Sequence, residues 1–319
     1  MKYHVVTVGA ATQDVFLISK NFRPWHYQGS YFNLLQYGSK IDVEDIVYDT
    51  GGGATNAAVT FARQGLHTSC MAKVGIDAAG REIVHTLNKE NVSTEHLLKS
   101  AQHHTGFSAL LKPFGGDRTV LVHRGASFKY SQKDFSVSSL QTDWLYISSL
   151  GGNLAVIKSL INWANRHEVY VAINPGSLEL AQRSKLANLL RQCQVVILNS
   201  DEACALTGHH TIMAALQSLH RAKIDTVLLT DGPRGSYVLH NGVVFRSGIY
   251  KKVRLVDRTG AGDAYGSGFV AAIIRGQTVE QAMSFAAANS TSVISYIGSK
   301  TGILRTHDVR QLKVKQIQF

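Results

Sequence analysis

Short apolar runs alternate with helical segments along most of this 319-residue chain. The apolar runs have the length of strands, and several are apolar throughout, which is typical of strands covered on both faces. Strands are predicted at residues 5–8, 69–74, 144–148, 169–173, 195–198 and 226–229, and helices at 54–64, 79–89, 154–166, 179–191, 211–221, 261–275 and 279–295. This alternation predicts an α/β fold, in which a doubly wound and mainly parallel sheet is flanked by helices.

Two segments interrupt the alternation. Residues 22–49 are aromatic and polar without a clear helix, and residues 105–123 contain two alternating runs around a glycine-rich turn. Both patterns favour strands of a small β lid that projects from the main sheet. The sequence has no Pro/Ser-rich linker, low-complexity tract or internal repeat. We therefore predict a single domain over residues 1–319, with lid insertions at about 15–50 and 105–124.

The chain is basic, with 33 Lys and Arg against 22 Asp and Glu, which gives a formal net charge of +11. The basic residues are scattered, and their longest run is Lys251-Lys252. Because nucleic-acid binders usually gather lysine and arginine into runs or onto one face, we expect no nucleic-acid partner. A solvated basic surface that attracts small anions is the favoured interpretation.

Cysteine usage and hydropathy exclude other classes of protein. The three cysteines, Cys70, Cys193 and Cys204, form no CxxC pair, which argues against a disulfide framework or a zinc site. No apolar stretch approaches the ~18 residues of a membrane span, so no membrane partner is expected. The apolar start contains Gln13 and Asp14 and is interpreted as a first strand and not as a signal peptide. Together these features predict a cytoplasmic protein.

A glycine-rich segment, Asp257-Arg-Thr-Gly-Ala-Gly-Asp263, opens one of the predicted helices. The backbone N–H groups of Gly260, Ala261 and Gly262 at a helix start are unpaired donors aided by the helix dipole, and they form an anion-binding site. A carboxylate beside that site suits Asp263 as a base that takes a proton from a nucleophile attacking a phosphoryl group. The structural alternative is a capped helix that follows a glycine turn.

A second glycine-rich segment, Gly51-Gly52-Gly53-Ala-Thr-Asn56, also precedes a helix. The glycines let a backbone approach a ligand closely, and Asn56 offers a donor and an acceptor to a hydroxyl group. A structural turn explains the glycines equally well. The Walker pattern is absent, and so is a Gly-x-Gly-x-x-Gly in a first βαβ unit, which argues against a nicotinamide enzyme. Asp14, at the end of the first strand region, is either a turn residue or a partner for a sugar hydroxyl.

Two further segments follow predicted strands. Asn199 and Glu202 stand one helical turn apart, where an oxygen-rich pair could organise hydrated Mg²⁺ and phosphate. Spacing alone favours the alternative, which is a helix N-terminus capped by Asn199 or its neighbour. Thr230, Gly232 and Gly235 fit a hairpin turn, although their place at a strand end also suits a nucleotide loop.

Taken together, these segments resemble the signatures of the ribokinase (PfkB) family of carbohydrate kinases. The segment from Gly52 to Asn56, with Gly65 and Gly75 after it, resembles the first family signature, and residues 257–263 resemble the second. The other two motifs lie between these signatures in the order of the family. The resemblance therefore spans nearly the whole chain, and it reverses the preference for a purely structural Asn199 and Glu202.

The resemblance implies a ribokinase-like fold with a β lid, MgATP as the phosphoryl donor, and a primary alcohol of a sugar or nucleoside as the acceptor. It implies that Asp263 deprotonates the acceptor hydroxyl, while the amides of residues 260–262 hold the charge on the transferred group. The sugar would be gripped by Asp14, Gly52, Gly53, Asn56 and Asp263. Phosphate and Mg²⁺ would be held, directly or through water, by Asn199 and Glu202. The nucleotide would be lined by Thr230, Gly232, Gly235 and Gly262. A monovalent cation such as K⁺ would be held by Asp257, Thr259 and Gly298.

Two positions depart from the family pattern. Arg258 replaces the usual small or hydroxyl residue, and it either adds a cation near the phosphates or points to solvent. In the final helix, Ala287 fits the register of the adenine-side residue of the family better than Asn289 does. The adenine contacts of this helix therefore stay open.

Our main hypothesis is an ATP-dependent sugar kinase that transfers the γ-phosphoryl group directly, with positioning and electrostatics supplying most of the acceleration. The alternatives are a nucleoside (adenosine-like) kinase and a non-catalytic sugar- or nucleotide-sensing protein on the same fold. The lid is expected to contact the acceptor, and Trp25, Tyr27 and Phe32 either stack on a ligand or pack the lid or a dimer interface. An exposed β lid can pair with another, so a homodimer through the lid is a further expectation.

Overall fold

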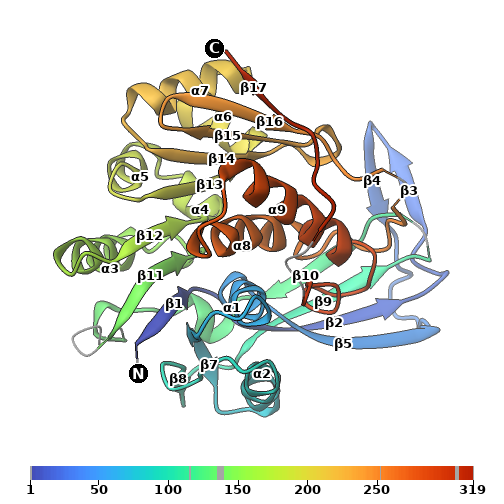
Figure 1. The fold of residues 1–319 in the computed structure, drawn as a ribbon. Coiled ribbons are helices and arrows are strands. Elements are labelled where there is room, and N and C mark those ends of the chain that lie inside the picture. The colour runs from blue at the N-terminus through green and yellow to red at the C-terminus, as the bar shows by residue number, and fades with distance from the viewer. Residues whose placement is uncertain (1, 115, 135–139, 252, 306–308, 319) are drawn as a thin grey trace.

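A computed structural model describes residues 2–114, 116–134, 140–251, 253–305 and 309–318 of the chain. The strands of its central sheet are β1 (Tyr3–Val8), β6 (Thr68–Met71), β11 (Thr142–Ile147), β12 (Tyr170–Ile173), β13 (Val195–Asn199), β14 (Thr226–Thr230), β15 (Ser236–His240), β16 (Val243–Ser247) and β17 (Val314–Ile317). Their order in the sheet is β17-β16-β15-β14-β13-β12-β11-β1-β6 (Figure 1). The strands from β6 to β14 run parallel, and β15, β16 and β17 extend one edge in antiparallel pairs.

The mainly parallel α/β sheet predicted from the sequence is confirmed, and all the predicted strands occur. One of them, at residues 69–74, is divided. Its first part is β6 in the central sheet, and its second part, β7 (Lys73–Gly75), leaves that sheet and pairs with β8 (Leu98–Ser100).

Helices cover both faces of the central sheet (Figure 1). One face is covered by α3 (Leu154–Arg166), α5 (Arg183–Leu190), α6 (Ser200–Thr207) and α7 (Ile212–Arg221), and the other by α1 (Gly53–Arg63), α8 (Ala261–Ile274) and α9 (Val279–Val293). Along β13, Val196 and Leu198 pack in the first of these cores, while Val195 and Ile197 pack in the second. Successive side chains of a strand point to opposite faces, so an apolar run is buried on both sides.

The predicted helices are confirmed, with one helix divided, one ending earlier and one helix added. The helix predicted at residues 179–191 is divided into α4 (Ser177–Leu180) and α5, because Gln182 leaves the helical conformation and its side chain donates to the Gly152 carbonyl. The short helix α6 was considered in the sequence as a capped helix start and is observed. The last helix ends at Val293, before the predicted 295. Helix α2 (Ala78–Lys89) agrees with its prediction.

A second sheet extends away from the central one, with the strand order β10-β9-β2-β5 (Figure 1). Its strands are β2 (Thr12–Ile18), β5 (Asp45–Gly51), β9 (Gly106–Lys112) and β10 (Thr119–His123). The alternating runs at 107–112 and 119–123 are confirmed as strands. Strand β2 was not expected as a separate element, so the placement of Asp14 at the end of the first strand was wrong: it lies inside β2. Phe16, Ile18 and Leu110 form the small core of this sheet.

A hairpin of β3 (Pro24–Tyr27) and β4 (Ser30–Asn33) lies beside the second sheet. The Asn33 side-chain amide donates to the Thr119 hydroxyl at 2.8 Å and so joins the hairpin to the start of β10. Trp25 and Tyr27 stack on each other at the surface.

Among the residues that the structure describes, no helix is long and apolar enough to cross a membrane.

Candidate active site

Asp263 lies in the first turn of α8, and it is partly accessible to solvent. Gly260 caps this helix with a φ of +76°, and a Cβ atom there would lie 2.6 Å from the Cβ of Ser299. The helical ladder begins with the bond from the Ala264 N–H to the Gly260 carbonyl at 2.8 Å. The earlier N–H groups, including that of the exposed Gly262, precede the ladder and point out of the helix end, where an anion is favoured.

Ala261 and Arg258 differ in how they could contribute to an anion site at this helix start. The N–H of Ala261, one of the three expected anion-binding amides, donates to the Arg258 carbonyl at 3.3 Å, so it already has a protein acceptor. Arg258 itself is exposed. The strongest candidates for anion binding are therefore the amides on either side of Ala261.

The start of α1 faces the start of α8. Gly52 caps α1 with a φ of +97°, and a Cβ atom there would lie 2.3 Å from the Ala10 carbonyl oxygen. A Cβ atom on Gly53 would lie 3.6 Å from an oxygen of Asp263. One turn later, the Asn56 side-chain amide donates to Asp263 Oδ2 at 2.8 Å. The two predicted motifs, 207 positions apart in the sequence for this pair, thus form one site.

Asp14 reaches the same region from the second sheet. It pairs across strands with Asp49 of β5 on one side and with Ser108 of β9 on the other. Thr12 donates to its carboxylate at 3.0 Å, and a Cβ atom on Gly51 would lie 2.0 Å from the other carboxylate oxygen. Asp14 therefore lies against the glycines that precede α1. Its burial raises the pKa of the carboxyl group above the ordinary 3.8.

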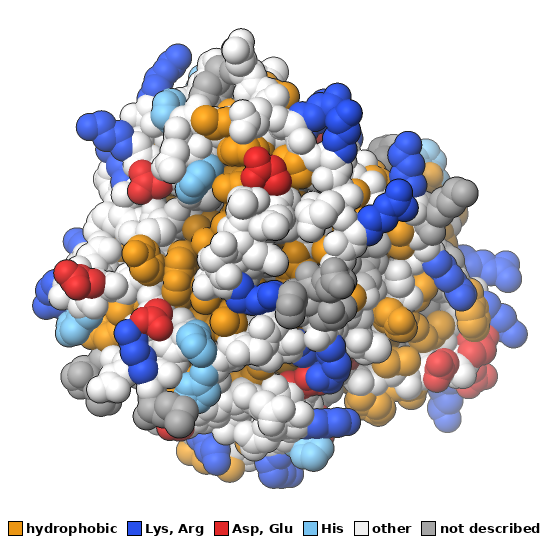
Figure 2. Space-filling view, viewed as in Figure 1, with side chains coloured by type: hydrophobic (Ala, Val, Ile, Leu, Met, Phe, Trp, Pro, Cys, Tyr) orange, Lys and Arg blue, Asp and Glu red, His pale blue; other side chains and the backbone are white. Residues whose placement is uncertain are grey.

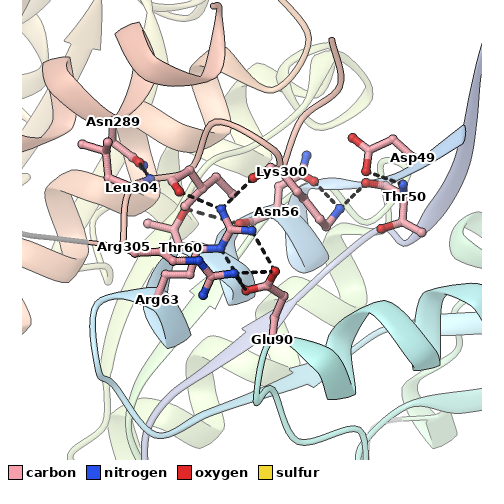
Figure 3. Close-up of polar contacts among 11 residues, drawn as sticks. Asp49, Thr50, Asn56, Thr60, Arg63, Glu90, Asn289, Lys300, Leu304 and Arg305 are labelled. Carbon is pink, nitrogen blue, oxygen red and sulfur yellow. Dashed lines mark hydrogen bonds and ion pairs between the residues drawn. The ribbon is translucent and has the colours of Figure 1, made fainter. Parts of the chain in front are cut away.

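The loop after α9 adds two residues that no sequence motif indicated. Lys300 is only 4% exposed, and its Nζ donates to Asn56 Oδ1 at 2.6 Å and also to the Thr50 carbonyl (Figure 3). The Ser299 hydroxyl donates to the same Asn56 oxygen at 2.8 Å, and the Ser299 N–H donates to Asp49 Oδ2 at 2.7 Å. A single lysine in a polar segment carries no periodic signal, and for this reason the sequence did not reveal it.

The environment of Asp263 is suited to a proton acceptor. Burial raises the pKa of its carboxyl group above the ordinary 3.8, while the hydrogen bond from Asn56 and the charge of Lys300 lower it. A carboxylate with a raised pKa is more basic than a solvated one, as a general base should be.

Asp257, Thr259 and Gly298, the expected ligands of a monovalent cation, lie together. The Thr259 hydroxyl donates to Asp257 Oδ1 at 3.0 Å, and the Gly298 N–H donates to Oδ2 at 3.3 Å. The Asp257 side chain is fully buried, and Nε of Arg118 lies 3.6 Å from its Oδ1. This ion pair already places a positive charge of the chain beside the carboxylate.

The expected nucleotide residues lie at the ends of two neighbouring parallel strands, where Asn199 of β13 pairs with Thr230 of β14. Asn199 and Glu202 form a capping box: the Glu202 N–H donates to Asn199 Oδ1 at 2.8 Å, and the Asn199 N–H donates to Glu202 Oε2 at 2.9 Å. Gly232 and Gly235 lie in the turn between β14 and β15, both with positive φ. The structure thus contains the capped helix and the hairpin turn, which the sequence offered as alternatives to a phosphate site and a nucleotide loop.

Asn289 and Ala287 of α9, which were compared as the adenine-side residue, are both among the described residues. The Asn289 side chain is buried, donates to the Ala264 carbonyl and accepts from the Leu304 N–H, so it joins α8, α9 and the following loop (Figure 3). Ala287 is buried as well.

No three His, Cys, Asp or Glu side chains of the described residues cluster to hold a metal ion.

Known proteins are similar to most of this chain in sequence. The family model described as pfkB family carbohydrate kinase matches residues 3–306. A ribokinase from Haemophilus influenzae is 25% identical over 263 residues, covering 79% of this chain and 83% of the relative. A nucleoside kinase from Methanothermobacter thermautotrophicus is 24% identical over 259 residues, covering 79% and 81%.

Solved structures show the same fold at lower sequence identity. The structure of Arabidopsis thaliana ribokinase complexed with ribose and ATP has a TM-score of 0.77 and 22% identity, covering 95% of this chain and 96% of that one. The crystal structure of adenosine kinase from Sinorhizobium meliloti has a TM-score of 0.76 and 22% identity, covering 94% and 96%.

Proposed function

The chain belongs to the pfkB family of carbohydrate kinases, and on this premise we propose that it transfers the γ-phosphoryl group of ATP to a primary hydroxyl group of a sugar. The observation that carries the proposal is the position of Asp263. It combines a carboxylate whose pKa is raised by burial with the open end of α8, so a base and an anion site lie within one helical turn.

In the proposed reaction, Asp263 accepts the proton of the acceptor hydroxyl while the hydroxyl oxygen forms a bond to the γ-phosphorus. The bond between the γ-phosphorus and ADP breaks, and ADP leaves from the opposite side. The amides of Gly260 and Gly262 stabilise the charge on the transferred group, with Ala261 a weaker donor because of its bond to Arg258. The donors are fixed before the reaction, so no reorganisation is needed when charge develops.

The sugar is proposed to lie over the start of α1, where Gly53 and Asn56 approach Asp263 and where Asp14 lies against Gly51, the neighbour of Gly52. Carboxylate and amide groups suit sugar hydroxyls because each can accept or orient a hydroxyl hydrogen bond. The base of the nucleotide is proposed to lie along the β14–β15 turn, beside Thr230, Gly232 and Gly235.

Mg²⁺ fits this site as an ion held mainly by ATP phosphates and water. When bound with ATP, it would neutralise phosphate charge. The capping box uses Oε2 of Glu202, which leaves Oε1 as the atom to meet a water of the ion. Burial raises the pKa of Glu202 above its ordinary 4.5, and a nearby cation would favour its ionised form.

K⁺ fits less well. Asp257 is the one charged group among its expected ligands, and it is already paired with Arg118. We therefore propose that turnover does not depend on added K⁺, although Thr259 and Gly298 both donate hydrogen bonds to Asp257.

The direct test is Asp263→Asn. We expect kcat to fall by about a thousandfold, the usual range for a lost general base, with acceptor affinity within a few fold of the original. The control is Asp143→Asn, which changes an exposed carboxylate that pairs with Lys2 far from the site. Near-normal turnover of Asp263→Asn would refute the proposed mechanism.

The acceptor is identified by a coupled kinase assay over fructose, ribose, tagatose phosphate, 2-keto-3-deoxygluconate and adenosine, with and without K⁺. Turnover of adenosine above all the sugars would favour the alternative, a nucleoside kinase. ATP and sugar binding without turnover of any acceptor would favour a non-catalytic sensor. The partly accessible Asp263 argues against a sensor, because a sensor has no need of a base.

The protein is also proposed to form a homodimer through the second sheet and the β3–β4 hairpin. Strand β10 is an edge of that sheet, and Val120, Leu121 and Val122 are all exposed on it. An exposed apolar edge strand is a template for pairing with another chain.

A further inference from the structure

We propose that Lys300 is a positioning residue for phosphoryl transfer: its ammonium group, together with the Ser299 hydroxyl, fixes the side-chain amide of Asn56 so that the amide donates to Asp263. This inference rests on the proposed role of Asp263 as the base. It adds to that role a group that does not touch the reacting atoms.

The hydrogen bonds define which way the Asn56 amide faces. Its oxygen accepts from Lys300 Nζ at 2.6 Å and from Ser299 Oγ at 2.8 Å, and its nitrogen donates to Asp263 Oδ2 at 2.8 Å. A rotated amide would set its NH₂ group against an ammonium group, which cannot accept, and its oxygen against a carboxylate. The two donors therefore select the one orientation that orients the base.

Burying the Lys300 ammonium group costs free energy of folding, which argues that the residue has a functional role. The side chain is buried, and burial lowers its pKa from the ordinary 10.5, while the charges of Asp49, Asp14 and Asp263 raise it. An apolar residue of similar length would avoid burying a charge and is often neutral or stabilising at such positions. Its hydrogen bonds to Asn56 and Thr50 tie that charge to the sugar side of the site (Figure 3).

The backbone of Lys300 is held independently of its ammonium group. Nη1 of Arg63 donates to the carbonyls of Lys300 at 2.8 Å and of Ile303 at 2.6 Å. Arg63 lies two turns after Asn56 on α1 and pairs with Glu90 at 2.7 Å (Figure 3). Helix α1 therefore carries both Asn56 and Arg63, which holds the loop, so the Lys300 ammonium group stays at a fixed distance from the Asn56 amide. Loss of the ammonium group alone should leave the loop in place.

The test is Lys300→Met in the full-length protein, assayed with the acceptor that the wild type turns over. A hydrogen bond to or from a charged group corresponds to roughly a tenfold to hundredfold effect, so we expect kcat to fall by that factor. We expect KM for the acceptor and for ATP to stay within about threefold, because Lys300 acts through Asn56 and not on the substrates.

Three further variants separate positioning from structure. Lys300→Gln, which keeps a donor, is expected to retain more activity than Lys300→Met. Ser299→Ala removes the second donor and is expected to lower kcat less, and its combination with Lys300→Met to lower kcat further. Lys99→Met, at an exposed lysine, is expected to match the wild type. The thermal midpoint of Lys300→Met should equal or exceed that of the wild type.

Two results would overturn the positioning role. One is a kcat of Lys300→Met within twofold of the wild type. The other is a loss of kcat/KM that comes from a higher KM for the acceptor, which would mean direct contact with the substrate. The proposed function fails in a different way, through unimpaired turnover of Asp263→Asn or the lack of any acceptor for the wild type. The two failures are therefore distinguishable.

Discussion

At the scale of single residues, the proposed base Asp263 is expected to set the pH dependence of the reaction. A base must be ionised to accept a proton, so activity is lost as the pH falls through its pKa. Burial raises that pKa above 3.8, the ordinary value. We therefore expect the acidic limb of the kcat profile to lie at a higher pH than a solvated aspartate would give. A profile of kcat between about pH 4 and 9 at saturating substrates measures it. A flat profile down to the lower limit would contradict this assignment.

Gly260 is one of the glycines whose backbone narrowly constrains the site. Alanine at this position meets two penalties: its φ of +76° lies in the left-handed region, and its Cβ would lie 2.6 Å from Ser299 Cβ and 2.9 Å from Ser299 Cα. We expect Gly260→Ala to destabilise the fold by roughly 2–4 kcal/mol, since strain and displacement add. We also expect a large loss of kcat, because the Ser299 loop must move.

Gly276→Ala is the matched control for this substitution. Gly276 has nearly the same φ, +74°, but a Cβ there meets nothing within 4 Å. It should therefore show only the conformational cost, about 1 kcal/mol, with unchanged kcat. Denaturant unfolding and steady-state kinetics of the two variants separate strain from contact. Equal effects of the two would show that the Ser299 contact is unimportant.

The residues of the site were only partly predictable from the sequence. Glycines and a carboxylate at a helix start have a local physical signature, so the Asp263 and Asn56 motifs could be found and are confirmed as neighbours. Lys300 has no such signature, because its proposed role depends on the packing of a loop against α1. The same holds for Arg118, whose partner Asp257 is 139 positions away (257 − 118) and which lies outside every motif.

At the scale of elements, Arg63 and Glu90 join α1, α2 and the loop after α9. Both side chains are nearly buried, at 8% and 10% exposure, and the Arg63 bond lowers the pKa of Glu90 from the ordinary 4.5. A lowered pKa in the folded state means that the stabilisation is present above the unfolded value and is lost as the pH falls through the folded value. We expect Glu90→Gln to cost about 3 kcal/mol near neutral pH, and less as the pH falls below about 4.5.

The measurement is thermal unfolding of wild type and Glu90→Gln at several pH values. Arg305→Met is the control, because Arg305 also pairs with Glu90 but is 69% exposed, and an exposed ion pair contributes less than about 1 kcal/mol. A difference between Glu90→Gln and wild type that stays constant on acidification would show that the ion pair does not stabilise the loop.

Elements with a clear hydrophobic period were predictable, and those whose ends depend on tertiary contacts were not. The strands of the parallel sheet are buried on both faces, so their apolar runs identify them without knowledge of their neighbours. Strand β2 carries the polar Gln13 and Asp14 and was merged with the first strand. The break at Gln182 depends on its bond to the Gly152 carbonyl, which no local pattern records.

At the scale of the whole molecule, the net charge of +11 does not locate the anion site. Figure 2 shows Lys and Arg side chains dispersed over the visible face and not gathered into one patch. The anion site that we propose instead consists of backbone amides at the start of α8, in the same helical turn as Asp263. The basic surface is then a weak general attraction for anionic ligands.

The second sheet bears on assembly, since it extends from the main body and leaves an apolar edge. Leu121 on β10 is 57% exposed, and Tyr31 on the adjoining hairpin is 74% exposed. We expect the protein to elute at twice the 34.8 kDa mass of the chain in size-exclusion chromatography with light scattering. Leu121→Asp places a charge on the pairing edge and is expected to shift the mass to one chain. Leu178→Asp, on α4 and 41% exposed, is the matched control and should leave the dimer intact. A monomeric wild type at micromolar concentration would exclude pairing through this sheet.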